Sequence, residues 1–169
     1  MDYVRVCAID AGTRNFAYCM CDNLTWNRPL VWRKEDLWAP QEGRKGKPNL
    51  QDIVEITHAW CMRQAEMLAS CDLVILENQL RKPFIAMNCV IQALHFNKTE
   101  VVHPMRVGTF FKLPKQREPK KAATVELCRK HALIPRNNGK EDDLADAWMM
   151  AVYGLVKRQA ISAKYFSES

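Results

Sequence analysis

The sequence predicts a single α/β domain with a mixed five-stranded sheet that is flanked by helices. Two observations lead to this class: three strand-like runs open the chain, and two further strand-like runs then alternate with amphipathic helical patterns. Strands joined by short turns pair antiparallel, whereas strands joined through a helix pair parallel, so the sheet is expected to be mixed. The chain has 169 residues, about the length of one domain. We expect the domain to span residues 1–158 and a C-terminal tail to cover residues 159–169.

The first third of the chain contains the three opening strands. Residues 3–9 form a short β-branched run that ends at the turn-forming segment 10–13. Residues 16–21 and 30–32 have the same character and are separated by a turn, which predicts an antiparallel meander. Residues 39–49 contain two prolines and two glycines, and this composition predicts a mobile loop.

The remaining two thirds of the chain alternate between helical and strand patterns. The helical stretches have apolar residues at a spacing of three and four, and the strand stretches are short apolar runs. Residues 105–119 have neither pattern and are expected to be irregular and basic. The last helix has the clearest apolar stripe. The expected elements are helix 50–68, strand 73–76, helix 84–96, strand 101–102, helix 119–131 with Pro119 in its first position, and helix 144–155.

Composition places the protein inside a cell and favours a polyanionic partner. The chain has 25 basic and 19 acidic residues, a net charge of +6. No apolar run reaches the ~18 residues of a membrane-spanning helix, and the N-terminus lacks a signal-peptide pattern. The seven cysteines occur without CxxC spacing, so we expect reduced, buried thiols rather than disulfides or zinc ligands. These features predict a reducing compartment, the cytoplasm or the nucleus, and no membrane contact.

Acidic residues stand where three predicted elements deliver side chains to one end of the sheet. Asp10 follows the first strand, Glu77 follows the central strand, and Asp142, Asp143 and Asp146 lie at the start of the last helix. Carboxylates from distant positions are needed to hold two divalent ions about 3.5–4 Å apart, and Mg²⁺ prefers oxygen ligands. Such ions align an attacking water and a leaving 3′ oxygen on a phosphorus atom, so the pattern indicates phosphodiester hydrolysis.

Each acid also has a purely structural explanation. Asp10 suits an Asx turn with Gly12 or Thr13, and Glu77 suits a solvated loop start. Acidic residues at the start of a helix gain ~0.3–1 kcal/mol from the helix dipole. Asp146 is harder to explain in this way, because it lies one turn inside the helix beside the apolar stripe. The joint arrangement therefore favours a site over separate structural roles.

Helical geometry selects two of the three aspartates on the last helix. At about 100° per residue from Leu144, Asp143 falls at about 260°, Asp146 at about 200° and Asp142 at about 160°. Asp143 therefore borders the buried face on the same side as Asp146, whereas Asp142 is expected to point toward solvent. We select Asp143 and Asp146 as the site residues of this helix.

Three segments together resemble the acidic motifs of a known nuclease family. They are IDAGTRNFA at residues 9–17, VILENQ at residues 74–79 and KEDDLADA at residues 140–147. In order and spacing they resemble the motifs of RuvC-type Holliday junction resolvases, above all the branch found in poxviruses, related large DNA viruses and fungal mitochondria. The resemblance extends over about residues 3–157.

This resemblance implies a ribonuclease H-like fold and a homodimer that makes paired nicks in four-way DNA junctions. It also implies dependence on Mg²⁺, for which we expect two ions per active site, with Mn²⁺ as an alternative ion. The residues implied as metal-binding catalytic acids are Asp10, Glu77, Asp143 and Asp146. We expect the helix at residues 84–96 to form the dimer contact.

Basic residues cluster over residues 112–121, which read KLPKQREPKK. A solvated loop is one explanation, but lysines at a helix start are disfavoured by the dipole, so a phosphate contact gives a compensating reason for them. The family has a basic active-site residue near this helix start, for which Lys121 is the first candidate and Lys120 the second. The residues expected to contact the DNA backbone are Arg14, Arg81, Lys82, Lys112, Lys115, Arg117 and Lys120. Phe84 beside them is expected to pack in the core, with stacking on DNA as the alternative.

Three other functions fit parts of the pattern. An actin-like ATP-binding module shares a turn such as Asp10–Thr13, but it needs two lobes and the chain has the length of one. A noncatalytic DNA-binding scaffold explains the basic residues but gives no reason for the converging acids. A ribonuclease H that cleaves RNA/DNA hybrids remains as the alternative among nucleases.

Overall fold

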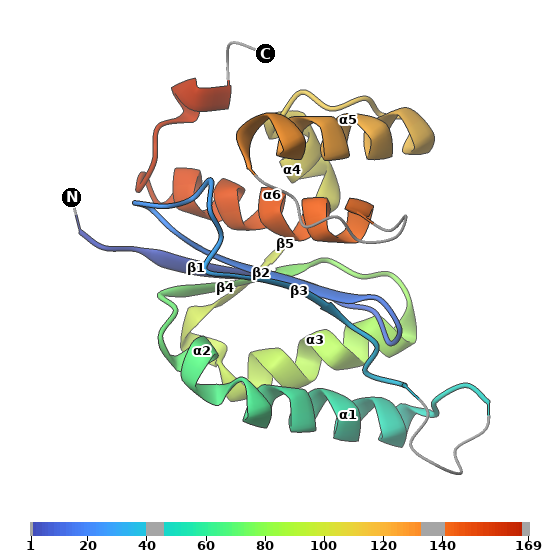
Figure 1. The fold of residues 1–169 in the computed structure, drawn as a ribbon. Coiled ribbons are helices and arrows are strands. Elements are labelled where there is room, and N and C mark those ends of the chain that lie inside the picture. The colour runs from blue at the N-terminus through green and yellow to red at the C-terminus, as the bar shows by residue number, and fades with distance from the viewer. Residues whose placement is uncertain (1, 40–45, 133–140, 167–169) are drawn as a thin grey trace.

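The computed structural model describes residues 2–39, 46–132 and 141–166. A five-stranded sheet lies in the middle of the molecule, with helices on both faces (Figure 1). The strands are β1 (Arg5–Asp10), β2 (Phe16–Asp22), β3 (Val31–Glu35), β4 (Leu73–Glu77) and β5 (Thr99–Val102). The helices are α1 (Leu50–Arg63), α2 (Ala65–Ala69), α3 (Lys82–Leu94), α4 (Pro104–Phe110), α5 (Arg117–His131) and α6 (Glu141–Lys157), with short 3-10 helices η1 (Phe96–Lys98) and η2 (Ala163–Phe166).

The sheet is mixed, as the order of its elements predicts. Its strand order is β3-β2-β1-β4-β5. The pairs β1/β2 and β2/β3 are antiparallel, whereas β4 is parallel to both β1 and β5. Because Ile9 of β1 is paired with Leu76 of β4, Asp10 and Glu77 come at the ends of adjacent parallel strands. Both carboxylates therefore lie at one edge of the sheet.

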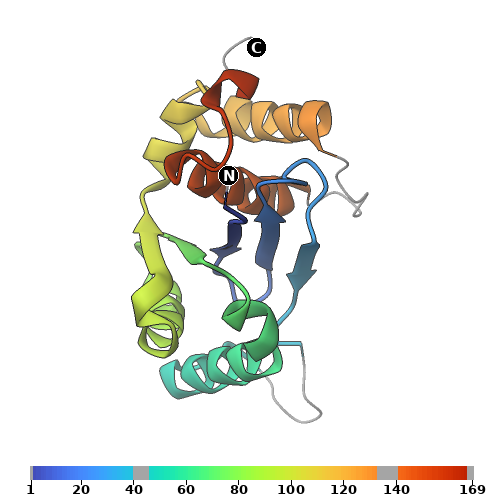
Figure 2. The same ribbon diagram turned by 90° about the vertical axis from the view of Figure 1, so that its left-hand side faces the viewer.

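Helices cover both faces of the sheet, but they are layered differently on the two faces. α1, α2 and α3 lie on one face, and α4, α5 and α6 lie on the other (Figures 1 and 2). α6 packs directly on β1 and β2, whereas α5 lies outside α6, farther from the sheet (Figure 1). The α4–α6 side therefore consists of a buried helix and an outer helix.

The pleat of the strands decides which side chains face α6. Val6 and Ala8 of β1 belong to the core shared with α6, whereas Cys7 and Ile9 belong to the core shared with α1 and α3. Side chains alternate between faces along a strand, so Asp10 follows Val6 and Ala8 onto the α6 face. The same alternation in β4 places Glu77 on the face of Leu73 and Ile75.

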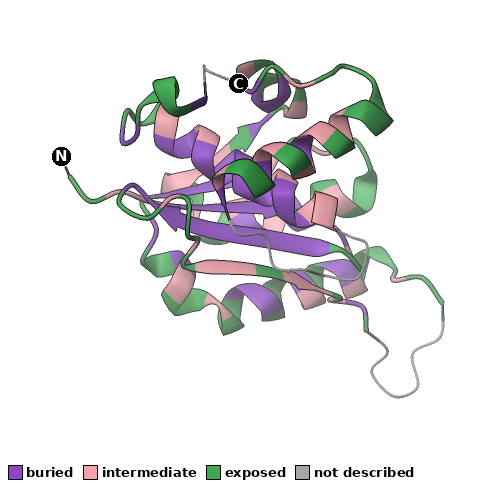
Figure 3. Cartoon of the chain, turned by 45° about the horizontal axis from the view of Figure 1, so that its top comes forward, coloured by how far each residue is buried: buried purple, intermediate pink, exposed green. Residues whose placement is uncertain are grey.

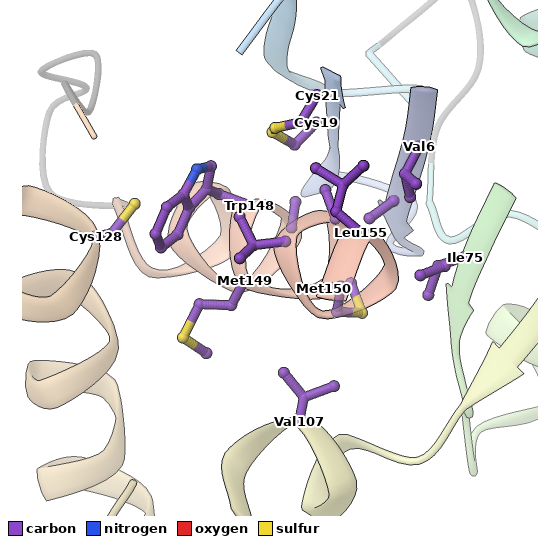
Figure 4. Close-up of a cluster of buried hydrophobic side chains, with 14 of the residues drawn as sticks. Val6, Cys19, Cys21, Ile75, Val107, Cys128, Trp148, Met149, Met150 and Leu155 are labelled. Carbon is purple, nitrogen blue, oxygen red and sulfur yellow. The ribbon is translucent and has the colours of Figure 1, made fainter. Parts of the chain in front are cut away.

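α6 is the most buried helix of the fold (Figure 3). Side chains from the sheet, α4 and α5 surround it, and Trp148 and Leu155 are fully buried there (Figure 4). Gly154 permits the close approach to the sheet: a Cβ at this position would lie 2.4 Å from Ile75 Cδ1 and 3.0 Å from Val6 Cγ1. This contact fixes α6, and with it the acids of its first turns, against β1 and β4.

Three predicted elements differ from the structure. Residues 105–119 are not irregular throughout, because α4 occupies Pro104–Phe110, where His103 caps the helix and Val107 is buried. Pro119 is not the first residue of its helix, since α5 begins at Arg117. The helix expected at residues 50–68 is divided at Gln64 into α1 and α2.

The remaining expectations concern the loop, the tail and the cysteines. Residues 40–45 of the predicted loop and residues 167–169 of the predicted tail lie outside the described residues. Residues 160, 161 and 166 of the tail are buried, and the Phe166 ring packs edge-on against Phe111. All seven cysteines are free and six of them are buried. Among the described helices none is long and apolar enough to span a membrane.

Candidate active site

A pocket of about 520 Å³ opens at the sheet edge where β1 and β4 end. Five carboxylates line it together with basic residues from the β1–β2 turn, the β4–α3 loop and α5. The acids are Asp10, Glu77, Asp142, Asp143 and Asp146, and the basic residues are Arg14, Arg81, Arg117, Lys120 and Lys121. The structure thus brings together all four acids selected from the sequence.

Asp10 reaches the pocket because a tight turn follows β1. Gly12 is required in this turn, since a Cβ there would lie 2.7 Å from the backbone oxygen of Asn15. Ala11 and Gly12 are buried and line the pocket wall beside Asp10. The DAG segment therefore serves the geometry of the site as well as its chemistry.

Glu77 is held from behind by a buried asparagine. Asn88 of α3 donates from Nδ2 to the backbone oxygen of Glu77 at 2.7 Å. The side chain of Asn88 is buried, and its Oδ1 has no hydrogen-bond partner among the described residues. Asn88 lies within the apolar pattern of α3, so no sequence signal predicted this contact.

Two residues of β3 hold the first turn of α6. Trp32 donates from Nε1 to the backbone oxygen of Leu144 at 2.8 Å, and Lys34 forms an ion pair with Asp143. Trp32 and Lys34 are two positions apart and so share one face of β3. The sequence analysis missed Lys34 because it ended this strand at residue 32. The alternation of Trp32 and Lys34, which continues the strand pattern past residue 32, was the sequence signal that could have identified Lys34.

Asp142 does not simply point toward solvent, contrary to the prediction. It forms an ion pair of 2.6 Å with Lys121, and its side chain is about as exposed as that of Asp143. Burial alone would raise the pKa of Asp142, but the hydrogen bond and charge of Lys121 bring it below its usual value. Helix α5 covers the side of α6 that carries Asp142. A helical wheel of α6 alone does not show this neighbouring helix.

Burial is the main influence on the pKa values of both Asp10 and Glu77. Burial raises the pKa of Asp10 well above its usual value, and the negative charges of Glu77, Asp146 and Asp143 raise it further. Burial also raises the pKa of Glu77, while Lys120 and a hydrogen bond from Asp10 oppose the increase. Asp10 and Glu77 therefore lie close enough for each to alter the pKa of the other.

Asp146 experiences the same environment. Burial is the main cause that raises its pKa to about 7, the positive charge of Lys120 opposes the increase, and three neighbouring carboxylates add to it. Buried carboxylates that repel one another need protons or cations nearby to remain in the folded protein.

The donor set fits a hard divalent cation, although the ligands are not assembled. All five acids offer oxygen, which is the preference of Mg²⁺, and no sulfur or imidazole lines the pocket. Within the described ranges no three His, Cys, Asp or Glu side chains form a group that could hold a metal ion. Lys34 and Lys121 pair with Asp143 and Asp142, so lysines occupy the places that a cation would take on these two carboxylates.

The two candidate lysines have different surroundings. Lys121 is paired with Asp142 and its side chain is 41% exposed. Lys120 lies against Gly108 of α4, and its charge lowers the pKa values of both Glu77 and Asp146. Lys120 is therefore the lysine that acts on the centre of the acid cluster.

The other predicted DNA contacts divide into three groups. Arg14, Arg81 and Arg117 line the pocket, whereas Lys82 and Lys115 are exposed outside its lining. Lys112 lines a different hollow of about 270 Å³ beside α5 and η2. Phe84 also lines the acid pocket, and it packs against the core between the sheet and α3.

Comparison with known proteins places the chain in a family. The sequence profile described as poxvirus A22 protein matches residues 4–158, which include every acid of the pocket. The chain belongs to the poxvirus A22 protein family. No protein of curated function matches the sequence significantly.

Solved structures similar to this A22-family chain confirm the predicted fold. The yeast mitochondrial Holliday junction resolvase Ydc2 is 15% identical, with a TM-score of 0.68 over 98% of this chain and 82% of that chain. The fowlpox virus resolvase, solved with substrate Holliday junction DNA, is 16% identical, with a TM-score of 0.61 over 92% and 99% of the two chains. RuvC of T. thermophilus, in complex with a Holliday junction substrate, is 15% identical, with a TM-score of 0.60 over 92% and 96%.

The raised pKa of Asp146 predicts how the metal-free protein responds to pH. The folded-state pKa of about 7 exceeds the unfolded value of ~3.9, so the folded state binds more protons between these values. The stability of the wild type is unaffected by this group below pH ~4 and decreases as pH rises through about 7. Asp146→Asn removes the ionisation. In EDTA at pH 8 we expect its Tm to exceed that of the wild type. The increase should be ~2–4 °C for each kcal/mol that the substitution adds to the free energy of unfolding.

Thermal unfolding between pH 4 and pH 8 measures this difference. The gap should close toward pH 4, and Glu66→Gln on the exposed surface of α2 serves as a control that should show no gap. An Asp146→Asn protein less stable than the wild type at pH 8 in EDTA would contradict the repulsion described above.

Proposed function

We propose that this chain is an endonuclease that resolves four-way DNA junctions by paired, symmetric nicks. The convergence of Asp10, Glu77, Asp143 and Asp146 at one edge of the sheet carries this proposal. Support comes from membership in the poxvirus A22 protein family and from a fold similar to that of resolvases solved with junction DNA.

The four acids would hold divalent cations, which we propose to be two Mg²⁺ ions, with Mn²⁺ as an alternative. When bound, such ions stabilise the charge that develops on a phosphate and lower the pKa of a bound water. Asp10 and Glu77 present their carboxylates from the rigid sheet, and Asp143 and Asp146 present theirs from the buried helix α6. This rigidity keeps the ligands in place without loop rearrangement.

Basic residues of the same pocket would hold the DNA. Arg14 and Arg81 lie on the loops that follow β1 and β4, and Arg117 begins α5. Contacts of this kind orient the phosphate backbone and do not read the base sequence, which suits an enzyme that recognises a branched shape. We propose that Lys120, rather than Lys121, stabilises the negative charge of the scissile phosphate. The charge of Lys120 acts on Glu77 and Asp146 at the centre of the site.

A homodimer would provide the two cuts. A four-way junction has two equivalent cleavage positions, and a two-fold dimer presents two identical sites to them. α3 carries the exposed apolar side chains of Ile85 and Leu94, and α1, which packs beside it, carries Leu50 and Met62. Both helices lie on the face of the sheet opposite to α5 and α6, and α3 is our candidate for the dimer contact.

Ribonuclease H activity on RNA/DNA hybrids is the second candidate function. The pocket acids suit either substrate, since both reactions hydrolyse a phosphodiester. The fold similarity to structures with junction DNA favours the first candidate.

The first prediction for this function concerns Asp146 and the choice of substrate. Wild-type protein with Mg²⁺ should cut a four-way junction much faster than a hybrid duplex. Asp146→Asn should reduce junction cleavage by about 10²-fold or more, because it removes a charged ligand, while gel-shift binding of the junction is retained. Full activity of this variant, or faster cleavage of the hybrid by the wild type, would refute the proposal.

The second prediction separates the two neighbouring lysines. Lys120→Met should reduce the single-turnover cleavage rate by about 10²-fold, since it removes charge from the centre of the site. Lys121→Met should have the smaller effect, because its partner Asp142 is outside the proposed ligand set. If Lys121→Met caused the larger loss of cleavage rate, the role at the scissile phosphate would belong to Lys121.

The third prediction concerns assembly. Sedimentation at micromolar protein should show a dimer, and the double variant Ile85→Glu/Leu94→Glu should shift it to monomer by placing charges in an apolar contact. The monomer should release nicked junctions rather than paired products. Leu24→Glu, at an exposed leucine in the β2–β3 connection, is the matched control. A wild-type monomer would exclude this interface.

A further inference from the structure

Thr124 of α5 has a buried hydroxyl group without a hydrogen bond. The residue is 1% exposed, and its Oγ1 has no hydrogen-bond partner among the described residues. A threonine inside a helix ordinarily donates to the carbonyl four residues earlier. Thr57 of α1 does so, with a distance of 2.7 Å from its Oγ1 to the oxygen of Ile53. Thr124 therefore lacks the usual structural use of its hydroxyl group.

The location of Thr124 indicates what the hydroxyl faces. Thr124 lines the acid pocket and lies about one helical turn from both Lys121 and Cys128 on the same side of α5. Lys121 contacts Asp142 of α6, and Cys128 lies near enough to Asp146 to interact with its charge. Thr124 thus lies on the side of α5 that faces the turn of α6 between these two acids.

Asp146 is the acid of this turn that lacks a hydrogen-bonding partner. Asp142 is bonded to Lys121 and Asp143 to Lys34, whereas the described residues include no side chain that donates to Asp146. A carboxylate that binds a cation through one oxygen keeps a second oxygen as an acceptor. In a buried site that oxygen needs a donor, and such outer partners orient the ligand.

We propose that Thr124 is a positioning residue whose hydroxyl donates a hydrogen bond to Asp146 when the site holds a divalent cation. This inference rests on the proposed function, because it requires Asp146 to be a ligand. It explains why a threonine occupies a buried position between α5 and α6. The unpaired hydroxyl in the metal-free protein is the cost of this arrangement, since a buried unsatisfied donor is destabilising.

Mg²⁺ binding without DNA tests the role of the hydroxyl. Thr124→Val keeps the volume of the side chain and removes the hydroxyl, whereas Thr124→Ser keeps the hydroxyl. Titration with Mg²⁺ alone, followed by calorimetry and by Tm, should give a Kd 10–100-fold weaker for Thr124→Val and close to the wild type for Thr124→Ser. In EDTA the Tm of Thr124→Val should equal or exceed that of the wild type.

The matched control is Thr57→Val, which removes a buried hydroxyl that has a partner and lies on the other face of the sheet. It should leave the Kd for Mg²⁺ unchanged. Wild-type affinity in Thr124→Val, or equal weakening in Thr124→Ser, would overturn the role of Thr124 and leave the proposed nuclease intact. Absence of Mg²⁺ binding by the wild type would instead refute the metal site of the proposed function.

Discussion

Repulsion among buried carboxylates is the constraint on which the rest of this structure depends. Strand pairing and pleat place Asp10 and Glu77 side by side on the α6 face, and α6 adds its own acids to the same pocket. Burial weakens the screening of these charges, so the neighbouring carboxylates raise the pKa of Asp10 and of Asp146. Such a cluster persists only because the surrounding elements are well packed. The contact of Gly154 with Val6 and Ile75 shows how closely α6 is fitted to the sheet.

Much of this arrangement is visible in the sequence because it depends on local pattern. Asp10 and Glu77 end apolar strand runs. Asp146 lies one turn inside a helix that has a regular apolar stripe. The missing parts depend on long-range packing. α4 is only seven residues long and contains Gly108, so its local pattern is weak, and the burial of Val107 against α6 stabilises it. Lys34 finds its partner 109 residues farther along the chain, which no local periodicity reveals.

The choice between Lys120 and Lys121 shows the same limit. Consecutive residues of a helix point about 100° apart, so the register of α5 decides which lysine faces the acids. A helix that begins at Pro119 places both lysines at the helix start. In the structure α5 begins two residues earlier, and the position of α4 places Gly108 beside Lys120. A short helix that the sequence pattern missed thus shapes the surroundings of the lysine.

The pocket acids and the two lysines of α5 occupy layers that differ in burial. The acids belong to the sheet and to α6, which are buried, whereas Lys120 and Lys121 belong to α5, the outer layer (Figure 1). In the metal-free protein the lysines neutralise the acids directly, as in the pair of Lys121 with Asp142. Divalent ions would take over this neutralisation, and the lysines would then need another anion. A phosphodiester is such an anion, so cation loading and DNA binding should favour each other through charge balance alone.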